Sequence, residues 1–175
     1  MTVQITTMKE QHLDQVLRIE QEISGIPWSR RLFEEEIARA KDRRYRVAVT
    51  EENEELLGYL GMLYIIDEAH IATVGVDPNH WGHQVATRLV LDALEAALAE
   101  GIKDCTLEVR AHNDRAKRLY QRFGFAPVAL RRGYYHDNGE DAIIMWLYDL
   151  DAPSELARRR GIADTLKQDW QKTHG

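Results

Sequence analysis

Hydrophobic residues recur along the chain at two spacings, and each spacing predicts one kind of element. Segments in which every second residue, or nearly every residue, is apolar predict strands. These segments are residues 3–6, 44–50, 56–66, 69–76, 105–110, 126–131 and 142–150. Apolar residues repeated every three or four positions predict helices. The helical segments are residues 7–23, 30–40, 84–100, 114–122 and 153–170. Strands and helices in this order predict a mixed α/β sheet with helices on both faces.

Polar residues at the helix ends support these boundaries. Thr7, with Glu10 three residues later, has the pattern of a capping box, so we expect the first helix to begin there. Ser29 and Asn113 stand directly before two further helices as candidate N-caps. Gly101 follows the long helix as a candidate C-terminal cap.

Composition narrows the class of protein. A chain of 175 residues with 44% hydrophobic and 30% charged residues indicates one globular domain. We place this domain at residues 1–150, followed by a helical extension at residues 151–175 whose run Arg158-Arg159-Arg160 is predicted to face solvent. The net charge of −6 argues against general nucleic-acid binding. The single cysteine excludes an intrachain disulfide, and neither a signal peptide nor a membrane-spanning run is found, so we expect a cytoplasmic protein without membrane attachment.

One stretch combines an apolar strand, a tight turn and a long helix. The strand ends at residue 76, the turn covers residues 77–83, and the helix begins at about Gln84. Free backbone N–H groups and the helix dipole favour an anion at such a helix start, typically a phosphate. Gly75, which has no side chain, would allow a bulge or a close approach by another backbone. An ordinary strand-to-helix connection is the alternative for this stretch alone.

Four motifs, taken in order along the chain, resemble those of the GNAT superfamily of acetyltransferases. They are Ile26-Pro27-Trp28-Ser29, Val76-Asp77-Pro78 with its turn, Leu107-Glu108-Val109-Arg110-Ala111-His112-Asn113 followed by Tyr120 and Phe123-Gly124-Phe125, and Arg131-Arg132-Gly133-Tyr134-Tyr135 ahead of Glu140-Asp141-Ala142-Ile143-Ile144-Met145. The third motif is diagnostic of the superfamily. The first and fourth narrow the resemblance to the RimI-type enzymes, which acetylate the N-terminal amine of a small-subunit ribosomal protein. The resemblance covers about residues 5–150 and implies a mostly antiparallel central sheet, acetyl-CoA as cosubstrate, and a protein N-terminus as partner.

The resemblance assigns the chemistry of acetyl transfer to two side chains. Glu108 matches the general base that takes a proton from the acceptor amine, and Tyr120 matches the general acid that protonates the coenzyme A thiolate. A carboxylate with an ordinary pKa of about 4.3 is a weak base for an amine. We therefore expect either that burial raises the pKa of Glu108 or that a water relays the proton. A surface glutamate and a buried structural tyrosine are the alternatives.

The resemblance also implies which residues bind the coenzyme. The backbone of Val74, Gly75 and Val76 is expected to pair with the pantetheine arm, and the Val76 N–H is a candidate donor to the oxyanion. The turn and the helix start are expected to bind the pyrophosphate, with help from the asparagine before the next helix. The residues concerned are Gly82, His83, Gln84, Val85, Ala86, Thr87 and Asn113.

The pyrophosphate turn departs from the family pattern Gln/Arg-x-x-Gly-x-Gly/Ala. Trp81 replaces the usual Gln or Arg, and Gln84 replaces the first Gly. We expect a helical backbone at Gln84, which tolerates a side chain. Little fixed positive charge is evident in this turn unless His83 is protonated, so weaker coenzyme binding is predicted. Gln84→Gly is then expected to tighten binding or leave it unchanged.

The acceptor side is predicted to be lined by Trp28, Arg131, Tyr134 and Tyr135, again from the resemblance. Two other functions stay open: a GNAT enzyme for a small amine or a lysine side chain, and a non-catalytic acyl-CoA-binding domain. The presence of both Glu108 and Tyr120 disfavours the last. No metal site is expected, because His80 and His83 lack further ligands nearby in the sequence. The sequence leaves the oligomeric state open.

Overall fold

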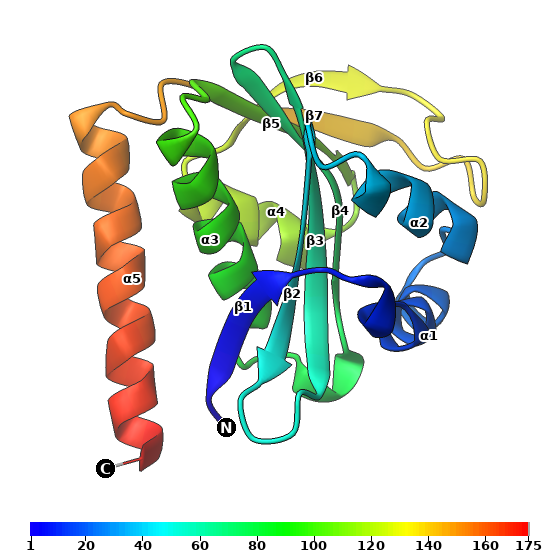
Figure 1. The fold of residues 1–175 in the computed structure, drawn as a ribbon. Coiled ribbons are helices and arrows are strands. Elements are labelled where there is room, and N and C mark those ends of the chain that lie inside the picture. Colours follow the sequence, from blue (N-terminus) through cyan, green and yellow to red (C-terminus); the bar gives the residue numbers. More distant parts are fainter. Residues whose placement is uncertain (175) are drawn as a thin grey trace.

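The computed structural model describes residues 1–174 as one seven-stranded sheet with five α-helices (Figure 1). The strands are β1 (Val3–Thr7), β2 (Arg43–Thr50), β3 (Leu56–Ile65), β4 (Glu68–Val76), β5 (Asp104–Arg110), β6 (Ala126–Arg131) and β7 (Ala142–Leu147). The helices are α1 (Leu13–Ile23), α2 (Arg30–Ala38), α3 (Val85–Ala99), α4 (Asp114–Arg122) and α5 (Pro153–His174). The predicted mixed sheet is confirmed.

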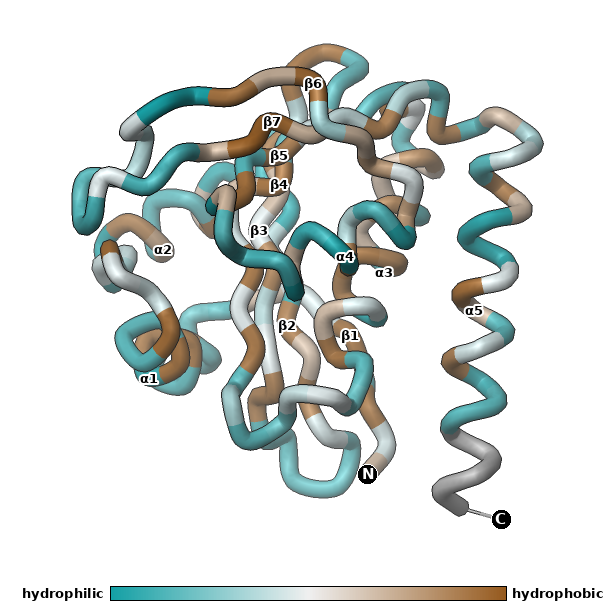
Figure 2. The backbone as a smooth tube through the Cα atoms, turned by 180° about the vertical axis from the view of Figure 1, so that it is seen from behind, coloured by the Kyte–Doolittle hydropathy of each residue, from teal (hydrophilic) through white to brown (hydrophobic). Residues whose placement is uncertain are grey.

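The helices cover both faces of the sheet. Helices α1 and α2 lie on one side, and α3 and α4 on the other, with α5 outside α3 (Figure 1). Apolar residues gather on the strands and on the inward sides of the helices (Figure 2). Because each helix has its apolar stripe on one side only, two layers are needed to bury both faces of the sheet.

The strand order is β1-β2-β3-β4-β5-β7-β6, and every neighbouring pair is antiparallel except β4 and β5. The parallel pairing of β4 with β5 extends only from Glu68↔Asp104 to Ile71↔Leu107. Beyond it, β4 stays paired with β3 as far as Val76, while β5 stays paired with β7 as far as Arg110. The sheet therefore divides into two halves, and the C-terminal ends of β4 and β5 move apart.

A bulge contributes to this separation. The register of β3 with β4 shifts between Gly61↔Thr73 and Met62↔Ile71, so that Ala72 has no partner residue. Bulges bend and twist the strand that carries them, here just where β4 leaves β5. The sequence predicted a bulge or a close approach at Gly75. The bulge lies three residues earlier, and the group that approaches Gly75 closely is the Tyr59 ring, a side chain rather than the predicted backbone.

The predicted start of the first helix is wrong. Thr7 is the last residue of β1, paired with Arg46, and its hydroxyl accepts a hydrogen bond from the Arg46 guanidinium at 3.2 Å. A 3₁₀ turn, Glu10–His12, then leads into α1. The caps at Ser29 and Asn113 are confirmed, since their side chains accept from the backbone N–H groups of Leu32 and Ala116 at 3.2 and 3.1 Å.

Helix α5 packs on the domain through its own side chains. Ile162 and Leu166 belong to the main hydrophobic core, which lies between the sheet and α3 and α4. Arg159 is 1% exposed and donates to the Leu150 carbonyl at 2.5 Å and to Glu95 at 3.2 Å. The prediction that the three consecutive arginines face solvent is therefore wrong for Arg159. Its aliphatic part is buried between α5 and the rest of the domain, while its guanidinium binds the connection between β7 and α5 and the side chain of Glu95 on α3.

Candidate active site

A cleft of about 690 Å³ opens where β4 and β5 separate. Its walls are the end of β4, the turn after it, the first turn of α3 and one side of α4. The structure brings nine of the ten predicted coenzyme-binding residues to this cleft: Val74, Gly75, Val76, Gly82, Gln84, Val85, Ala86, Thr87 and Asn113. The tenth, His83, is not among the lining residues.

The backbone at Gln84 differs from our expectation. It has φ 62° and ψ 22°, in the left-handed region, and forms the N-cap of α3 rather than its first helical residue. The helical conformation predicted from sequence is therefore wrong. Glycine reaches this region at no steric cost, which accounts for the glycine at this position in the family pattern that the turn resembles. Gln84 keeps this conformation with its side-chain oxygen accepting from Thr87 at 3.0 Å and from Arg122 at 3.2 Å.

Positive charge in the cleft comes from α4 rather than from the turn. Arg115, Arg118 and Arg122 all line the cleft, at spacings that place them on one side of the helix. Arg115 stacks its guanidinium over Trp81, 4.4 Å from the ring centroid. In the described part of the chain no carboxylate forms an ion pair with any of the three. The predicted shortage of positive charge is therefore wrong for the cleft as a whole, because α4 supplies three arginines to it.

Glu108 projects from the middle of β5 on the same face as Thr106 and Arg110, as the alternation of buried residues requires. Its Oε2 atom lies 2.5 Å from Nε2 of His70 on β4. The hydrogen bond from His70 lowers the pKa of Glu108, and this effect exceeds the opposing effect of burial. The expectation that burial raises the pKa of Glu108 is therefore wrong.

His70 was not identified from the sequence. It lies opposite Thr106 in the β4–β5 register, 38 positions from Glu108 in the chain. No local motif marks it, because only strand pairing joins the two side chains. Both line a second, smaller pocket of about 190 Å³, together with Ile65 and Trp146.

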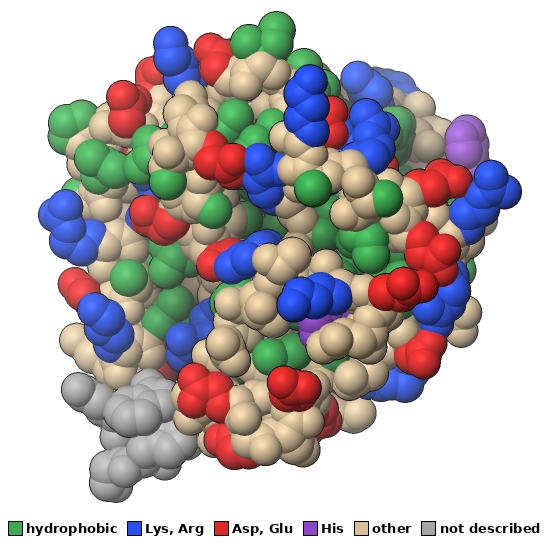
Figure 3. All heavy atoms as spheres, viewed as in Figure 1, with side chains coloured by type: hydrophobic (Ala, Val, Ile, Leu, Met, Phe, Trp, Pro, Cys, Tyr) green, Lys and Arg blue, Asp and Glu red, His purple; other side chains and the backbone are tan. Residues whose placement is uncertain are grey.

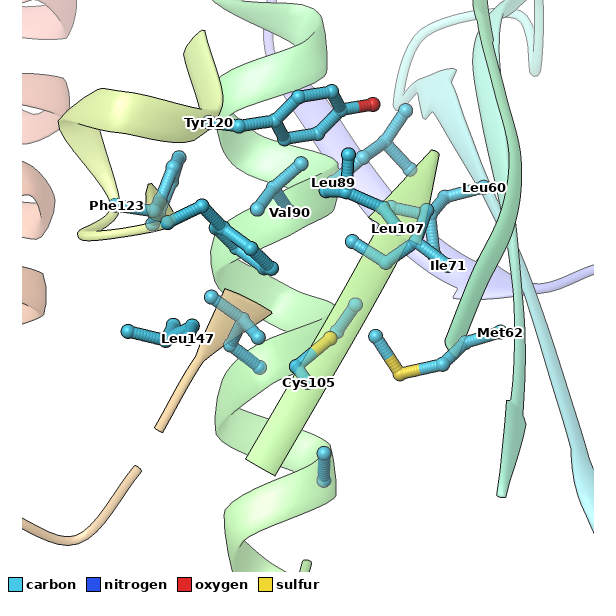
Figure 4. Packing of buried hydrophobic residues seen from close by; sticks show 14 of the residues in the cluster. Leu60, Met62, Ile71, Leu89, Val90, Cys105, Leu107, Tyr120, Phe123 and Leu147 are labelled. Carbon is cyan, nitrogen blue, oxygen red and sulfur yellow. The ribbon is translucent and has the colours of Figure 1, made fainter. Parts of the chain in front are cut away.

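Tyr120 lies on α4 with its ring buried between that helix and α3. Figure 4 shows the ring beside Leu89 and Val90, with the hydroxyl pointing away from α4. The ring packs edge-on against Phe125 at a centroid distance of 5.8 Å. Burial raises the pKa of the phenol, which therefore stays protonated at neutral pH. Among the described residues no hydrogen-bond partner of the hydroxyl was found, and Tyr120 is not counted among the cleft-lining residues.

Two loops meet at the mouth of the cleft. Arg110, at the end of β5, donates to Asp137 at 2.9 and 3.1 Å and to Glu140 at 3.2 Å, and so holds the β6–β7 loop. Its guanidinium lies 3.9 Å from the ring centroid of Tyr135. On the other side, Gly25 of the α1–α2 loop is so close to Asp137 that an added methyl group would overlap it. Sequence reasoning gave Arg110 no separate role in binding this loop.

The predicted acceptor-side residues lie on these same two loops and on β6. Tyr134 is 40% exposed and packs edge-on against Tyr135 at 5.1 Å, with Arg131 5.8 Å above its ring. Trp28 is partly buried against Phe33, at a centroid distance of 5.3 Å. The structure thus brings three of the four together on one hairpin and places Trp28 on the opposite loop.

Other chemistries find little support. Among the described residues no group of three or more His, Cys, Asp and Glu side chains could hold a metal ion. Cys105 is fully buried and burial raises the pKa of its thiol, as is usual for a core cysteine. Acidic and basic side chains are interspersed over the face shown in Figure 3. No described helix is both long and apolar enough to span a bilayer.

A sheet divided between two parallel strands, with a cleft at the division and a helix starting beside it, defines the acetyltransferase fold that the motifs suggested. Residues 13–125 match the acetyltransferase (GNAT) family, and the chain belongs to that family. It is accordingly an N-acetyltransferase, in a family whose members use acetyl-CoA.

Named relatives narrow the similarity further. The Escherichia coli K12 ribosomal protein bS18-alanine N-acetyltransferase is 30% identical over 145 residues, which cover 82% of this chain and 95% of the relative. A Bacillus subtilis protein that carries this name provisionally is 33% identical over 143 residues, covering 82% and 93%. The crystal structure of the E. coli ribosomal-protein-S18-alanine N-acetyltransferase has a TM-score of 0.76 at 27% identity and covers 85% of this chain and 94% of that one.

A more distant structure shares the fold. Arabidopsis thaliana NAA60, crystallised with acetyl-CoA, has a TM-score of 0.74 at 20% identity, covering 84% of this chain and 98% of that one.

Proposed function

We propose that this chain transfers an acetyl group from acetyl-CoA to the N-terminal α-amine of a protein, and that this protein is a small-subunit ribosomal protein. The observation that carries the proposal is the presence of two sites beside strands β4 and β5, where the sheet divides. A cleft with a helix start suited to an anion lies against α3 and α4, and its arginines have no carboxylate partner among the described residues. A carboxylate paired with a histidine lies between strands β4 and β5. The E. coli relative, similar over nearly its whole length, supplies the acceptor class.

The cleft fits acetyl-CoA by size and charge. A volume of about 690 Å³ is within the usual range for sites that enclose a cofactor. The unpaired part of β4 offers backbone groups to an extended arm, and the N-terminus of α3 with Arg122 offers donors to phosphate. When bound, acetyl-CoA would supply an activated thioester carbonyl.

The chain's own residues would then move two protons. Glu108, held by His70, accepts a proton from the ammonium form of the acceptor, directly or through water, because an α-amine with a pKa of about 7.7–8.0 arrives mostly protonated. Tyr120, protonated at neutral pH, donates a proton to the departing sulfur. The Val76 N–H is the candidate donor to the carbonyl oxygen. Val74 and Gly75 align the arm, and Trp28, Arg131, Tyr134 and Tyr135 hold the acceptor.

Mass spectrometry tests the acceptor class. The protein is incubated with acetyl-CoA and a peptide carrying the N-terminal sequence of E. coli bS18, beside the same peptide with a blocked α-amine and intact lysines. We expect one acetyl group on the free α-amine and none on the blocked peptide. Acetylation of lysine or of free polyamines in its place would contradict the proposed acceptor.

A further inference from the structure

Gln84 holds a left-handed backbone conformation that most side chains avoid. Its φ of 62° is one of four positive values at non-glycine residues among those described. In this region the Cβ atom approaches the following carbonyl oxygen, so residues other than Gly, Asn and Asp rarely adopt it. Such strain persists where the surroundings hold it in place, often beside a functional site.

The Gln84 side chain links two helices. Its Oε1 atom accepts from the Thr87 hydroxyl at 3.0 Å, within the first turn of α3, and from Nη1 of Arg122 on α4 at 3.2 Å. Thr87 is 5% exposed, so the first contact is shielded from water and fixes the amide. In the described chain, Gln84 is the only hydrogen-bond partner found for the Arg122 guanidinium.

Arg122 is therefore held beside the start of α3 with most of its donors unused. A guanidinium has five N–H groups, and only one of them is satisfied by Gln84. No carboxylate among the described residues pairs with it, although the protein as a whole has a net charge of −6. An unpaired guanidinium in a cleft is suited to a phosphate, which it can bind at two points.

We propose that Gln84 is a positioning residue for the coenzyme: it holds Arg122 at the N-terminus of α3, where the pyrophosphate binds. The inference rests on the proposed function for the identity of the ligand. In this arrangement the side chain compensates for the glycine that relatives carry at this position, because it adds a placed cation to the helix start. Arg122 contacts the phosphate, and Gln84 acts through Arg122.

This role reverses the expectation drawn from sequence. Gln84→Gly removes the backbone strain and should raise the melting temperature of the ligand-free protein by about 2–4 °C. The same substitution releases Arg122, and we expect the Kd for coenzyme A to rise about tenfold, as for loss of one well-placed charged contact. Stability and affinity therefore change in opposite directions, which a simple loss of folding would not produce.

A double-mutant cycle tests whether the effect passes through Arg122. Coenzyme A is titrated calorimetrically, without acceptor, into the wild type, Gln84→Gly, Arg122→Gln and the double variant. We expect Gln84→Gly to change the Kd by less than about twofold in the Arg122→Gln background, because neighbouring groups that act together are not additive. For Gln84→Gly, kcat at saturating acetyl-CoA should stay near the wild-type value while KM for acetyl-CoA rises.

Glu54→Gly is the matched control. Glu54 is also left-handed, with φ 55°, but lies in the β2–β3 turn and is not among the cleft residues. Glu54→Gly should therefore raise the melting temperature and leave the Kd for coenzyme A unchanged. An unchanged or tighter Kd for Gln84→Gly, or a loss of equal size when Arg122 is already Gln, overturns the inference and leaves the proposed function intact. If the wild type itself fails to bind coenzyme A, the proposed function falls and this inference with it.

Discussion

At the scale of single residues, the hydrogen bond between His70 and Glu108 keeps the carboxylate charged. It lowers the pKa of Glu108 although burial acts in the opposite direction. Because the pKa of Glu108 is lower in the folded state, this bond stabilises the fold at pH values above the unfolded pKa of about 4.3. This contribution is lost as the pH falls through the folded-state pKa. His70→Ala removes the bond and leaves the burial, so the pKa of Glu108 should rise from its depressed value.

Carbon-13 NMR of labelled glutamate measures that pKa directly. Turnover should fall about tenfold at neutral pH, because the carboxylate loses the partner that orients it, although its basicity rises. Thr106→Val is the control, since Thr106 lines the same pocket but donates its hydroxyl to the Met145 carbonyl at 2.9 Å. An unchanged pKa of Glu108 in His70→Ala would remove His70 from this role.

Tyr120 permits a separate test at the same scale. Tyr120→Phe removes only the hydroxyl, for which no partner was found among the described residues, so the melting temperature should change little. Loss of the general acid should lower kcat about a hundredfold. Affinity for coenzyme A, measured by calorimetry, should stay within about twofold. A loss of affinity as large as the loss of turnover would instead mean that Tyr120 is structural.

At the scale of elements, Arg110 connects β5 to the β6–β7 loop. Arg110→Met keeps much of the side-chain volume but removes the bonds to Asp137 and Glu140, so the loop should open. We expect KM for the acceptor peptide to rise about tenfold and protease cleavage in the loop to accelerate. Arg132→Met, on the same hairpin and exposed, is the control and should do neither. An unaltered peptide KM in Arg110→Met would argue against the loop as part of the acceptor site.

The close packing of Gly75, on β4, against Tyr59 can be tested by its effect on stability. In Gly75→Ala the new methyl group would overlap the ring of Tyr59, whose hydroxyl donates to Glu20 and leaves little room to move. Overpacking of this kind costs about 1–3 kcal/mol of unfolding free energy, measurable by urea denaturation. Gly161→Ala, in the open middle of α5, should instead gain about 0.5–1 kcal/mol. Equal stability of the two variants would contradict the close approach.

At the scale of the whole molecule, α5 completes the core. Ile162 and Leu166 are buried against the body beside Arg159, and burying each of these two apolar side chains contributes about 1.5–3 kcal/mol. A chain ending at residue 150 should therefore lose about 3–6 kcal/mol of unfolding free energy, a large part of a typical domain's stability. Its melting temperature and solubility measure this. If residues 1–150 fold alone with unchanged stability, the extension is dispensable to the domain.

Elements with strong local signals were predicted well. Helix α4 and strand β6 have their predicted bounds, because a capping Asn113, a glycine stop at Gly124 and a short apolar run define them locally. The predicted helix start at Thr7 and the predicted strand end at residue 150 were wrong. Pairing with Arg46 extends β1 through Thr7, and a left-handed backbone at Asp149 follows the end of β7. Both depend on contacts that lie outside the local pattern.

The sequence by itself determined the fold class, the family and nine of the residues that line the cleft, because spacing, turns and motifs are properties of neighbours along the chain. Only the tertiary structure decided what surrounds them. Strand pairing brings His70 to Glu108, the packing of α4 brings three arginines to the cleft, and Arg122 meets Gln84 across 38 positions of chain. The turn at Gln84, left-handed rather than helical, shows the physical reason: a pKa, a charge or a strained backbone is set by atoms that are close in space.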